Sequence, residues 1–365
     1  MDRREFLVRS GGLILGATVI SLTGCEFNSV DPITTGKSVS FLTPVDEFYY
    51  KNGAETSIRD WSLPIVDRSA WQLRIDGLVS NPLNISIADI EAESANAINL
   101  LKTMRCVIDS NDVQGLIGTA VWRGVPLRIF LERAGIDTIN TKRLFLYGED
   151  TFTNNISLNE LLNPGEGLIE PLLVTHMNGQ PLTAEHGAPV RLIIHNSFGY
   201  KNVKWINRVE ATADDTTLFG TYQEAGFVDD GVQRVVSRAT DPLQNGQVPA
   251  GTVEVQGFAV SGAAGISSVM VSVNGRGFTE AIIQAQEDVL ASDPLLPETI
   301  QFAGEGFSYP FTGVWVKWSH KFEATPGAYK VDIKAVDAAG NEQPQTDNEI
   351  SDSINAISSI TFSVV

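Results

Sequence analysis

Alternating hydrophobic and polar residues predict short strands along most of the chain from Phe41 onward. Between the strands, 87–93 has the pattern of a short helix start, and 127–134 has helical spacing. The pair Asn178-Gly179 directly follows a strand and predicts a hairpin. This mixture predicts an α+β domain over 41–241. Its predicted strands are 71–77, 143–147, 172–177, 189–195 and 205–211.

The pattern changes at Asp241-Pro242, beyond which almost only strand-like alternation remains. Turn signals such as Asn274-Gly275 separate the runs. Short strands at this spacing over 242–365 predict an all-β immunoglobulin-like sandwich, with 285–306 as a long loop inside it. The predicted strands are 252–260, 267–273, 315–322, 329–336 and 358–364.

Residues 1–25 have the pattern of an export signal. Arg3 and Arg4 precede an uncharged apolar run, 11–22, and small residues follow it. A basic start, a short apolar run and a small-residue cleavage site are typical of a secretory signal. The arginine pair resembles a twin-arginine signal, which exports folded proteins. An ordinary signal with a chance arginine pair is the alternative.

Leu22-Thr23-Gly24-Cys25 resembles a lipobox, in which the cysteine is lipidated. A chance cysteine is the alternative. The segment 26–40 lacks hydrophobic periodicity and contains Pro, Thr and Ser, which predicts a tether. We therefore expect an exported protein of the periplasm or cell envelope, attached to the membrane only through a lipid anchor at Cys25.

The chain is acidic, with a formal net charge of −18. A nucleic-acid partner is not expected, because phosphate recognition needs a basic surface. Solubility is the simplest explanation of the acidity. An acidic surface would also suit a basic redox partner.

The cysteine count directs attention to one residue. The chain has 2 cysteines, Cys25 and Cys106. If Cys25 carries lipid, Cys106 has no second cysteine with which to form a disulfide, which is unusual in an exported protein. One explanation of Cys106 is structural: it is a buried cysteine that acts as a small hydrophobic residue. A thiolate that binds a soft metal is the functional one.

Several motifs follow one another around and beyond this cysteine. Together, in this order and spacing, they resemble the sulfite oxidase family of molybdopterin enzymes, over roughly 41–365. Three segments of the tail, 255–259, 271–275 and 335–343, resemble the dimerisation domain of that family. The motifs of the first domain are Met-Arg-Cys-Val at 104–107, Trp-Arg-Gly-Val-Pro-Leu at 122–127, Met-Asn-Gly-Gln-Pro-Leu at 177–182, His-Gly-Ala-Pro-Val-Arg at 186–191 and Gly-Tyr-Lys-Asn-Val-Lys-Trp at 199–205.

The resemblance implies a molybdenum-molybdopterin cofactor whose metal is bound by Cys106, the catalytic ligand. A thiolate suits such a metal, and the pterin phosphate needs cationic donors. The resemblance implies that His186, Arg191 and Lys204 hold the pterin and its phosphate. Lys201 lies in the same basic run, and we expect it to bind the cofactor as well. Two further residues match positions of the family: Asn52 as a pterin contact and Tyr222 as an active-site tyrosine. A structural histidine and solvated lysines are the alternatives.

The resemblance also implies partners. No Cys-x-x-Cys-His motif for c-type haem occurs, so we expect electrons to pass to or from a separate c-type cytochrome or other redox partner. The other partner is a small oxo donor or acceptor. The sandwich is expected to form a homodimer. A cofactor inserted in the cytoplasm would also explain a signal that exports folded proteins.

The chain departs from the family where a substrate anion would bind. The residues 107–111, Val-Ile-Asp-Ser-Asn, include no arginine, and Lys51 stands where the family has an arginine. Two acids beside the site, Asp109 and Asp112, would repel a sulfite dianion. We therefore expect a poor sulfite oxidase. Asp150 lies at the substrate mouth or is an exposed loop acid.

Two alternatives remain open. Met-Arg-Cys-Val at 104–107 is closer to periplasmic methionine sulfoxide reductases, which lack the C-terminal sandwich. This favours a sulfoxide reductase-like activity as the alternative within the enzyme class. A non-catalytic envelope protein that keeps the fold is the alternative outside it.

Overall fold

The computed structural model describes residues 14–15, 18–19, 40–51, 63–347, 349 and 351–365. Most of the predicted signal, the lipobox cysteine Cys25 and most of the predicted tether lie outside these residues, as does Asn52. Two short strands, β1 (Ile14–Leu15) and β2 (Thr18–Val19), pair with each other. Within the described ranges, no helix combines the length and the apolar character needed to cross a membrane.

The first domain contains two sheets. One sheet has the order β10-β9-β6-β5, with β11 also on β9, and the other has the order β4-β3-β12-β7-β8. Pairing is antiparallel except for β12 with β3, which is parallel. The strands are β3 (Gln72–Gly77), β4 (Leu83–Ser86), β5 (Ile98–Arg105), β6 (Ile117–Pro126), β7 (Arg143–Gly148), β8 (Thr153–Ser157), β9 (Leu172–Met177), β10 (Gln180–Pro181), β11 (Arg191–Ile193) and β12 (Ile206–Thr212).

Short helices connect these strands, so the α+β prediction holds for this domain. Two of the helices begin with a capping box, in which Ser86 pairs with Asp89 and Ser157 with Glu160. Each box satisfies backbone donors at the helix start, which lets very short helices form. The helices are α2 (Ile87–Ala92), η1 (Ser94–Asn96), α3 (Leu127–Arg133), α4 (Leu158–Leu162), η2 (Gly199–Lys201) and α5 (Thr221–Glu224).

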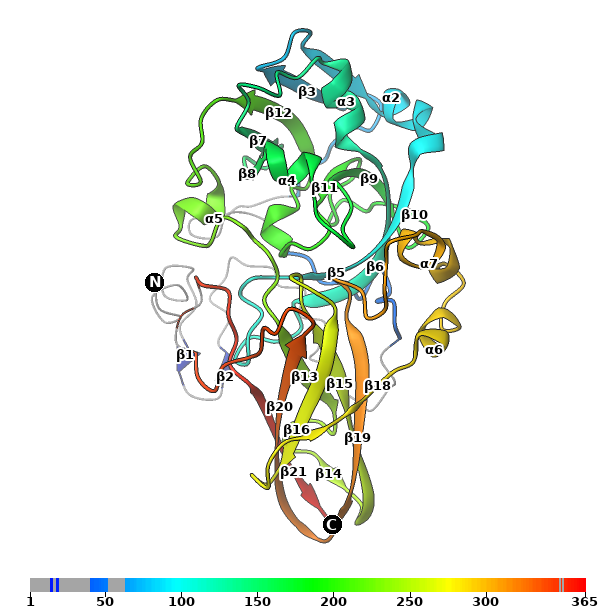
Figure 1. The fold of residues 1–365 in the computed structure, drawn as a ribbon, viewed down its shortest axis with the longest axis vertical. Coiled ribbons are helices and arrows are strands. Elements are labelled where there is room, and N and C mark those ends of the chain that lie inside the picture. Colours follow the sequence, from blue (N-terminus) through cyan, green and yellow to red (C-terminus); the bar gives the residue numbers. More distant parts are fainter. Residues whose placement is uncertain (1–13, 16–17, 20–39, 52–62, 348, 350) are drawn as a thin grey trace.

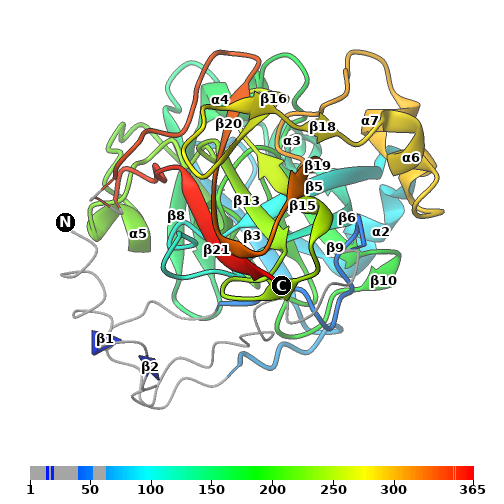
Figure 2. The same cartoon turned by 90° about the horizontal axis from the view of Figure 1, so that it is seen from below.

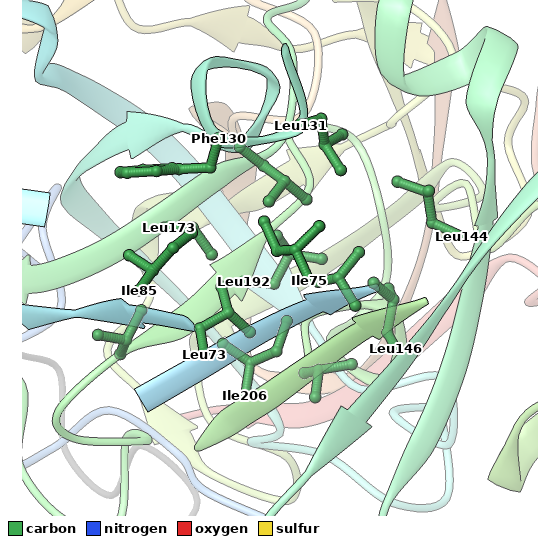
Figure 3. Close-up of a cluster of buried hydrophobic side chains, with 14 of the residues drawn as sticks. Leu73, Ile75, Ile85, Phe130, Leu131, Leu144, Leu146, Leu173, Leu192 and Ile206 are labelled. Atoms are coloured by element: carbon green, nitrogen blue, oxygen red, sulfur yellow. The ribbon is translucent and has the colours of Figure 1, made fainter. Parts of the chain in front are cut away.

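The two sheets share one hydrophobic core with α3. Leu73 and Ile75 of β3 point toward Leu173 of β9 and Leu192 of β11, and Phe130 of α3 lies against them (Figure 3). All five side chains are buried. Burial of this apolar surface is the main force that holds the two sheets together.

The second domain is a sandwich of two sheets. One has the order β13-β15-β19-β18, and the other has the order β14-β21-β20-β16-β17. Valines from both sheets, such as Val255 and Val271, meet in one buried core. Figure 2 views this domain with β21 in front. The strands are β13 (Val236–Asp241), β14 (Gln247–Val248), β15 (Gly251–Val260), β16 (Ile266–Val273), β17 (Thr279–Glu280), β18 (Ile282–Ile283), β19 (Val316–Ala324), β20 (Gly327–Asp337) and β21 (Ser358–Val364).

Two details of the second domain differ from the sequence prediction. The segment 285–306, predicted as a long loop, contains three short helices: α6 (Gln286–Leu290), η3 (Leu296–Glu298) and α7 (Ile300–Ala303). The strand β13 already pairs with β15, so the sheet begins before the expected boundary at Asp241.

The β5–β6 hairpin lies between the two domains (Figure 1). Leu101 of β5 and Val121 of β6 pack with Phe258 and Trp315 of the second domain. Trp315 donates its backbone N–H to Thr103 Oγ1 over 2.7 Å. The second domain therefore supports the strand that leads to Cys106.

Candidate functional site

Cys106 is the first residue after β5 and lies at the end of the β5–β6 hairpin. Its backbone N–H donates to Leu116 O over 2.9 Å, and its own carbonyl accepts from Asp109 N over 3.0 Å. These two bonds hold the residue in a tight turn. The side chain is 5% exposed and reaches a partly open cavity.

This space, the Cys106 cavity, collects most of the predicted site residues. Cys106, His186, Arg191, Lys204, Tyr222 and Asp150 all line it. They come from separate parts of the chain and meet only in the folded protein. The remaining lining residues are Tyr49, Tyr50, Lys51, Met104, Phe152, Glu185, Gly199, Tyr200 and Asn202.

His186 is a neutral ring on the wall of the cavity. Burial lowers its pKa to about 4, although an interaction with the carbonyl of Val45 opposes the shift. Nε2 lies 3.1 Å from Val45 O. With this carbonyl as acceptor, Nε2 carries the ring proton and Nδ1 is an acceptor.

Arg191 is held by backbone carbonyls that orient its guanidinium. Nη1 donates to His186 O over 3.0 Å, and Nη2 donates to Asn202 O over 3.1 Å. The guanidinium lies 5.1 Å from the ring centroid of Trp122. Nε is buried and finds no acceptor among the residues that the structure describes. This donor fits a ligand that supplies an oxygen or nitrogen acceptor.

Lys204 supplies the second cation of this wall. Its Nζ donates to Glu185 O over 2.9 Å and lies 4.4 Å from the ring centroid of Trp205. Burial lowers its pKa well below the ordinary value. Gly187 has φ +100°, and a Cβ there would lie 2.9 Å from Lys204 Cβ. A glycine at position 187 therefore leaves room for the Lys204 side chain.

Aromatic rings form a further wall of the cavity. The ring of Tyr222 stacks on Tyr200 with centroids 5.0 Å apart, and Phe152 lies 6.1 Å from Tyr222. Lys51 Nζ lies 6.0 Å from the Tyr222 ring centroid. Tyr200 is fixed by donating its hydroxyl to Val228 O over 2.5 Å.

Tyr49 also lines the cavity, and the sequence analysis did not single it out. It is 6% exposed, and burial raises the pKa of its phenol well above the ordinary value, so the hydroxyl stays protonated. In the sequence it sits in the run Phe48-Tyr49-Tyr50, which an ordinary core segment could equally contain. Only the folded structure shows that Tyr49 lines the cavity and is not simply a core residue.

Lys201 lies away from the cavity. Its ammonium donates to Asn155 O over 2.6 Å and to Asp229 O over 2.8 Å, and Asp229 Oδ1 is 3.5 Å away. These contacts use the lysine to join β8 to the segment after α5. Of the basic run, Lys204 therefore reaches the cavity and Lys201 does not.

The two acids that were expected to repel a substrate do not face the cavity. Asp109 is fully buried behind Cys106, where Arg238 and Arg105 neutralise it. Asp112 is exposed on the loop. The acids that line the cavity are Asp150 and Glu185, and burial raises the pKa of Asp150.

Comparisons with known proteins agree with this arrangement. Residues 61–219 match the oxidoreductase molybdopterin binding domain family. Sulfite oxidase of Arabidopsis thaliana is 27% identical over 370 residues, covering 87% of this chain and 86% of the plant protein. A nitrate reductase of Leptosphaeria maculans is 28% identical over 54% of this chain, but the match spans 23% of that protein. The sulfane dehydrogenase SoxCD of Paracoccus pantotrophus shares the fold, with a TM-score of 0.72 at 18% identity, covering 97% of this chain and 88% of that one.

A molybdopterin-binding oxidoreductase is therefore the class of protein that these likenesses define. The chain belongs to the sulfite oxidase family of molybdopterin-dependent oxidoreductases, and its cofactor is molybdenum-molybdopterin.

The residues of the Cys106 cavity fit this cofactor. A buried thiol is available for the metal, and thiolate is a ligand that soft metals prefer. The unsatisfied Nε of Arg191 and the ammonium of Lys204 offer cationic donors for a phosphate. His186 adds a neutral ring on the same wall.

Proposed function

We propose that this enzyme is exported and transfers an oxygen atom to or from a small, uncharged substrate, with a sulfoxide as the substrate class that fits best. The observation that supports this proposal most directly is the aromatic wall of the Cys106 cavity, formed by Phe152, Tyr200 and Tyr222. Aromatic rings bind apolar groups well and contribute little to holding an anion. Electrons are exchanged with a separate redox protein.

The charges in the cavity support an uncharged substrate. With His186, Arg191 and Lys204 assigned to the cofactor, Lys51 is the remaining cation among the described lining residues. Asp150 and Glu185 line the same space. A dianion would approach one lysine and two acids, and a lysine lacks the planar fork of an arginine.

Each residue of the cofactor set has a distinct proposed task. Cys106 ligates the metal through its thiolate, and the hydrogen bonds of its turn fix the direction of the sulfur. Arg191 and Lys204 hold the anionic end of the cofactor through charge-assisted hydrogen bonds. His186 contributes a hydrogen bond without a charge. When bound, the cofactor supplies the two-electron chemistry that accompanies oxygen transfer.

A substrate panel tests the proposal. Purified protein is first analysed for metal, and about one molybdenum per chain is expected. It is then assayed with methyl phenyl sulfoxide and a reduced dye, and with sulfite and an oxidised dye. Turnover of the sulfoxide with weak or absent sulfite oxidation is the expected result. Fast sulfite oxidation without sulfoxide reduction would overturn the choice of substrate.

Sulfite is the second candidate substrate. The observation in its favour is the likeness to a plant sulfite oxidase over 87% of this chain. Lys51 and the neighbouring Arg191 would then have to hold the anion together. The same panel separates the two candidates, because only sulfite passes electrons to an oxidised dye.

Export, anchoring and dimerisation complete the proposal. The twin-arginine-like start and the lipobox-like Cys25 support export with a lipid anchor. Replacing Arg3 and Arg4 with lysine should keep active precursor in the cytoplasm, and Cys25→Ala should release soluble protein. The second domain is proposed to be immunoglobulin-like and to form a two-fold dimer. Light scattering that gives a monomer at micromolar concentration would contradict the dimer.

A further inference from the structure

Tyr49 places a hydrogen-bond donor on the wall of the Cys106 cavity. Its ring is buried and stacks on Phe48, with centroids 5.6 Å apart. Its hydroxyl meets no hydrogen-bond acceptor within the part of the chain that the structure describes. A buried hydroxyl without an acceptor is costly, so its presence calls for a ligand.

The hydroxyl lies close to the metal-binding cysteine. A Cβ added to Gly199 would lie 2.8 Å from Tyr49 Oη and 3.9 Å from Cys106 Cα. The Tyr49 hydroxyl and the Cys106 backbone therefore both lie beside Gly199, where a side chain would collide with the hydroxyl. Gly199 also lines the cavity.

Packing does not require the hydroxyl. A phenylalanine at position 49 would keep the stack on Phe48 and the same buried ring. Tyr200, another buried phenol of this cavity, already uses its hydroxyl as a donor to Val228 O. The Tyr200 hydroxyl thus already donates a hydrogen bond within the protein, whereas the Tyr49 hydroxyl can donate one to a ligand.

We propose that Tyr49 determines substrate specificity by donating its O–H to the oxygen atom of the bound substrate, beside Cys106. This inference rests on the proposed function, because it requires an oxygen-bearing, uncharged substrate. The bond forms only with the oxide, since the corresponding sulfide is a poor acceptor. Tyr49 then favours the oxide over the sulfide without transferring a proton.

Tyr49→Phe tests the proposal in the molybdenum-loaded enzyme. Tyr309→Phe is the control, because Tyr309 does not line the Cys106 cavity and donates its hydroxyl to Gln284 O over 2.7 Å. Binding of methyl phenyl sulfoxide is measured by calorimetry in oxidised enzyme without an electron donor, so that no turnover occurs. The inhibition constant of methyl phenyl sulfide is measured in the steady-state assay. Tyr49→Phe should weaken sulfoxide binding by about tenfold, the value of one hydrogen bond, and leave the sulfide constant unchanged.

Thermal unfolding of the cofactor-free proteins supplies a second readout. Tyr49→Phe should keep or raise the midpoint, because it removes a polar group that lacks an acceptor. Tyr309→Phe should lower the midpoint, because Gln284 O loses its donor, and should leave sulfoxide binding unchanged. This contrast separates a binding role from a structural one.

The outcomes are distinguishable. If wild type binds the sulfoxide and Tyr49→Phe binds it equally well, Tyr49 has no such role and the proposed function stands. If Tyr49→Phe weakens sulfoxide and sulfide equally, the variant has distorted the cavity and the inference is overturned. If wild type holds molybdenum but binds no sulfoxide, the proposed substrate fails and the inference fails with it.

Discussion

Arg238 Nη1 donates to Asp109 Oδ2 over 2.7 Å, and both side chains are buried. Asp109 belongs to the turn that follows Cys106, whereas Arg238 belongs to β13 of the second domain. Asp109 Oδ1 also accepts from Leu116 N over 3.1 Å, which closes the Cys106 turn. Through this one carboxylate, the second domain holds the turn that carries Cys106, the proposed metal ligand.

Arg238→Met should destabilise the protein by about 3 kcal/mol, because it removes one partner of a buried ion pair. Arg105 Nε, 3.7 Å from Asp109 Oδ2, remains as a weaker partner. Denaturant unfolding measures the loss, and metal analysis should show less molybdenum per chain. The matched control is Arg68→Met, which breaks an exposed pair with Glu91 and should cost less than ~1 kcal/mol. Equal losses for both variants would contradict this role of Arg238.

Cys106→Ser should abolish turnover while leaving the fold intact. A serine hydroxyl is a poor ligand for a soft metal, although it is close to the thiol in size. Turnover, molybdenum content and the circular dichroism spectrum are measured together. A variant that keeps wild-type turnover would show that Cys106 is not the metal ligand. Cys25→Ala is the control for loss of a cysteine as such, and its turnover should be unchanged.

Local signals predicted much of the fold. The pair Asn178-Gly179 does form a turn in which both residues have positive φ, as its sequence requires. The predicted strands of both domains are present, but β5 and β6, which flank Cys106, were not among them, because almost all of their residues are buried and show no alternation. The segment 285–306 was predicted incorrectly, because its helices are only three to five residues long and carry too little periodicity to detect.

The site was predictable only in part. The motifs led to Cys106, His186, Arg191 and Lys204, which the fold does bring to one cavity. Closeness to Cys106 in the sequence did not predict which acidic residues line the cavity, because the turn directs Asp109 away from it. No local pattern identifies a hydroxyl whose acceptor is missing, as at Tyr49, since that property depends on contacts between distant segments.

The buried His186 should make stability depend on pH. Its pKa is about 4 in the folded protein and near 6.5 when unshifted. Between these values the unfolded state binds more protons, so the free energy of unfolding decreases as pH falls from 6.5 toward 4. Above this window the contribution to stability is fully present. His186→Gln should reduce the slope of unfolding free energy against pH by up to ~1.4 kcal/mol per pH unit. An unchanged slope in cofactor-free protein would contradict the shift.

Asp150, rather than Asp109 or Asp112, should limit the use of sulfite. Asp150 lines the Cys106 cavity, and a carboxylate several ångströms from a bound anion repels it by on the order of 1–4 kcal/mol. Asp150→Asn keeps the shape of the side chain and removes the charge. We expect sulfite kcat/KM to rise by about tenfold or more, with the sulfoxide value nearly unchanged, because an uncharged substrate does not feel this repulsion.

Asp112→Asn is the matched control, since it removes the same charge from the exposed loop outside the cavity. Water and salt screen a charge in that position, so sulfite kinetics should stay at the wild-type value. Raising the salt concentration separates the two sites further, because it weakens long-range surface effects more than contacts inside the cavity. If Asp112→Asn improved sulfite turnover as much as Asp150→Asn, the net charge of the protein would be limiting. The acid on the cavity wall would then have no special effect on the choice of substrate.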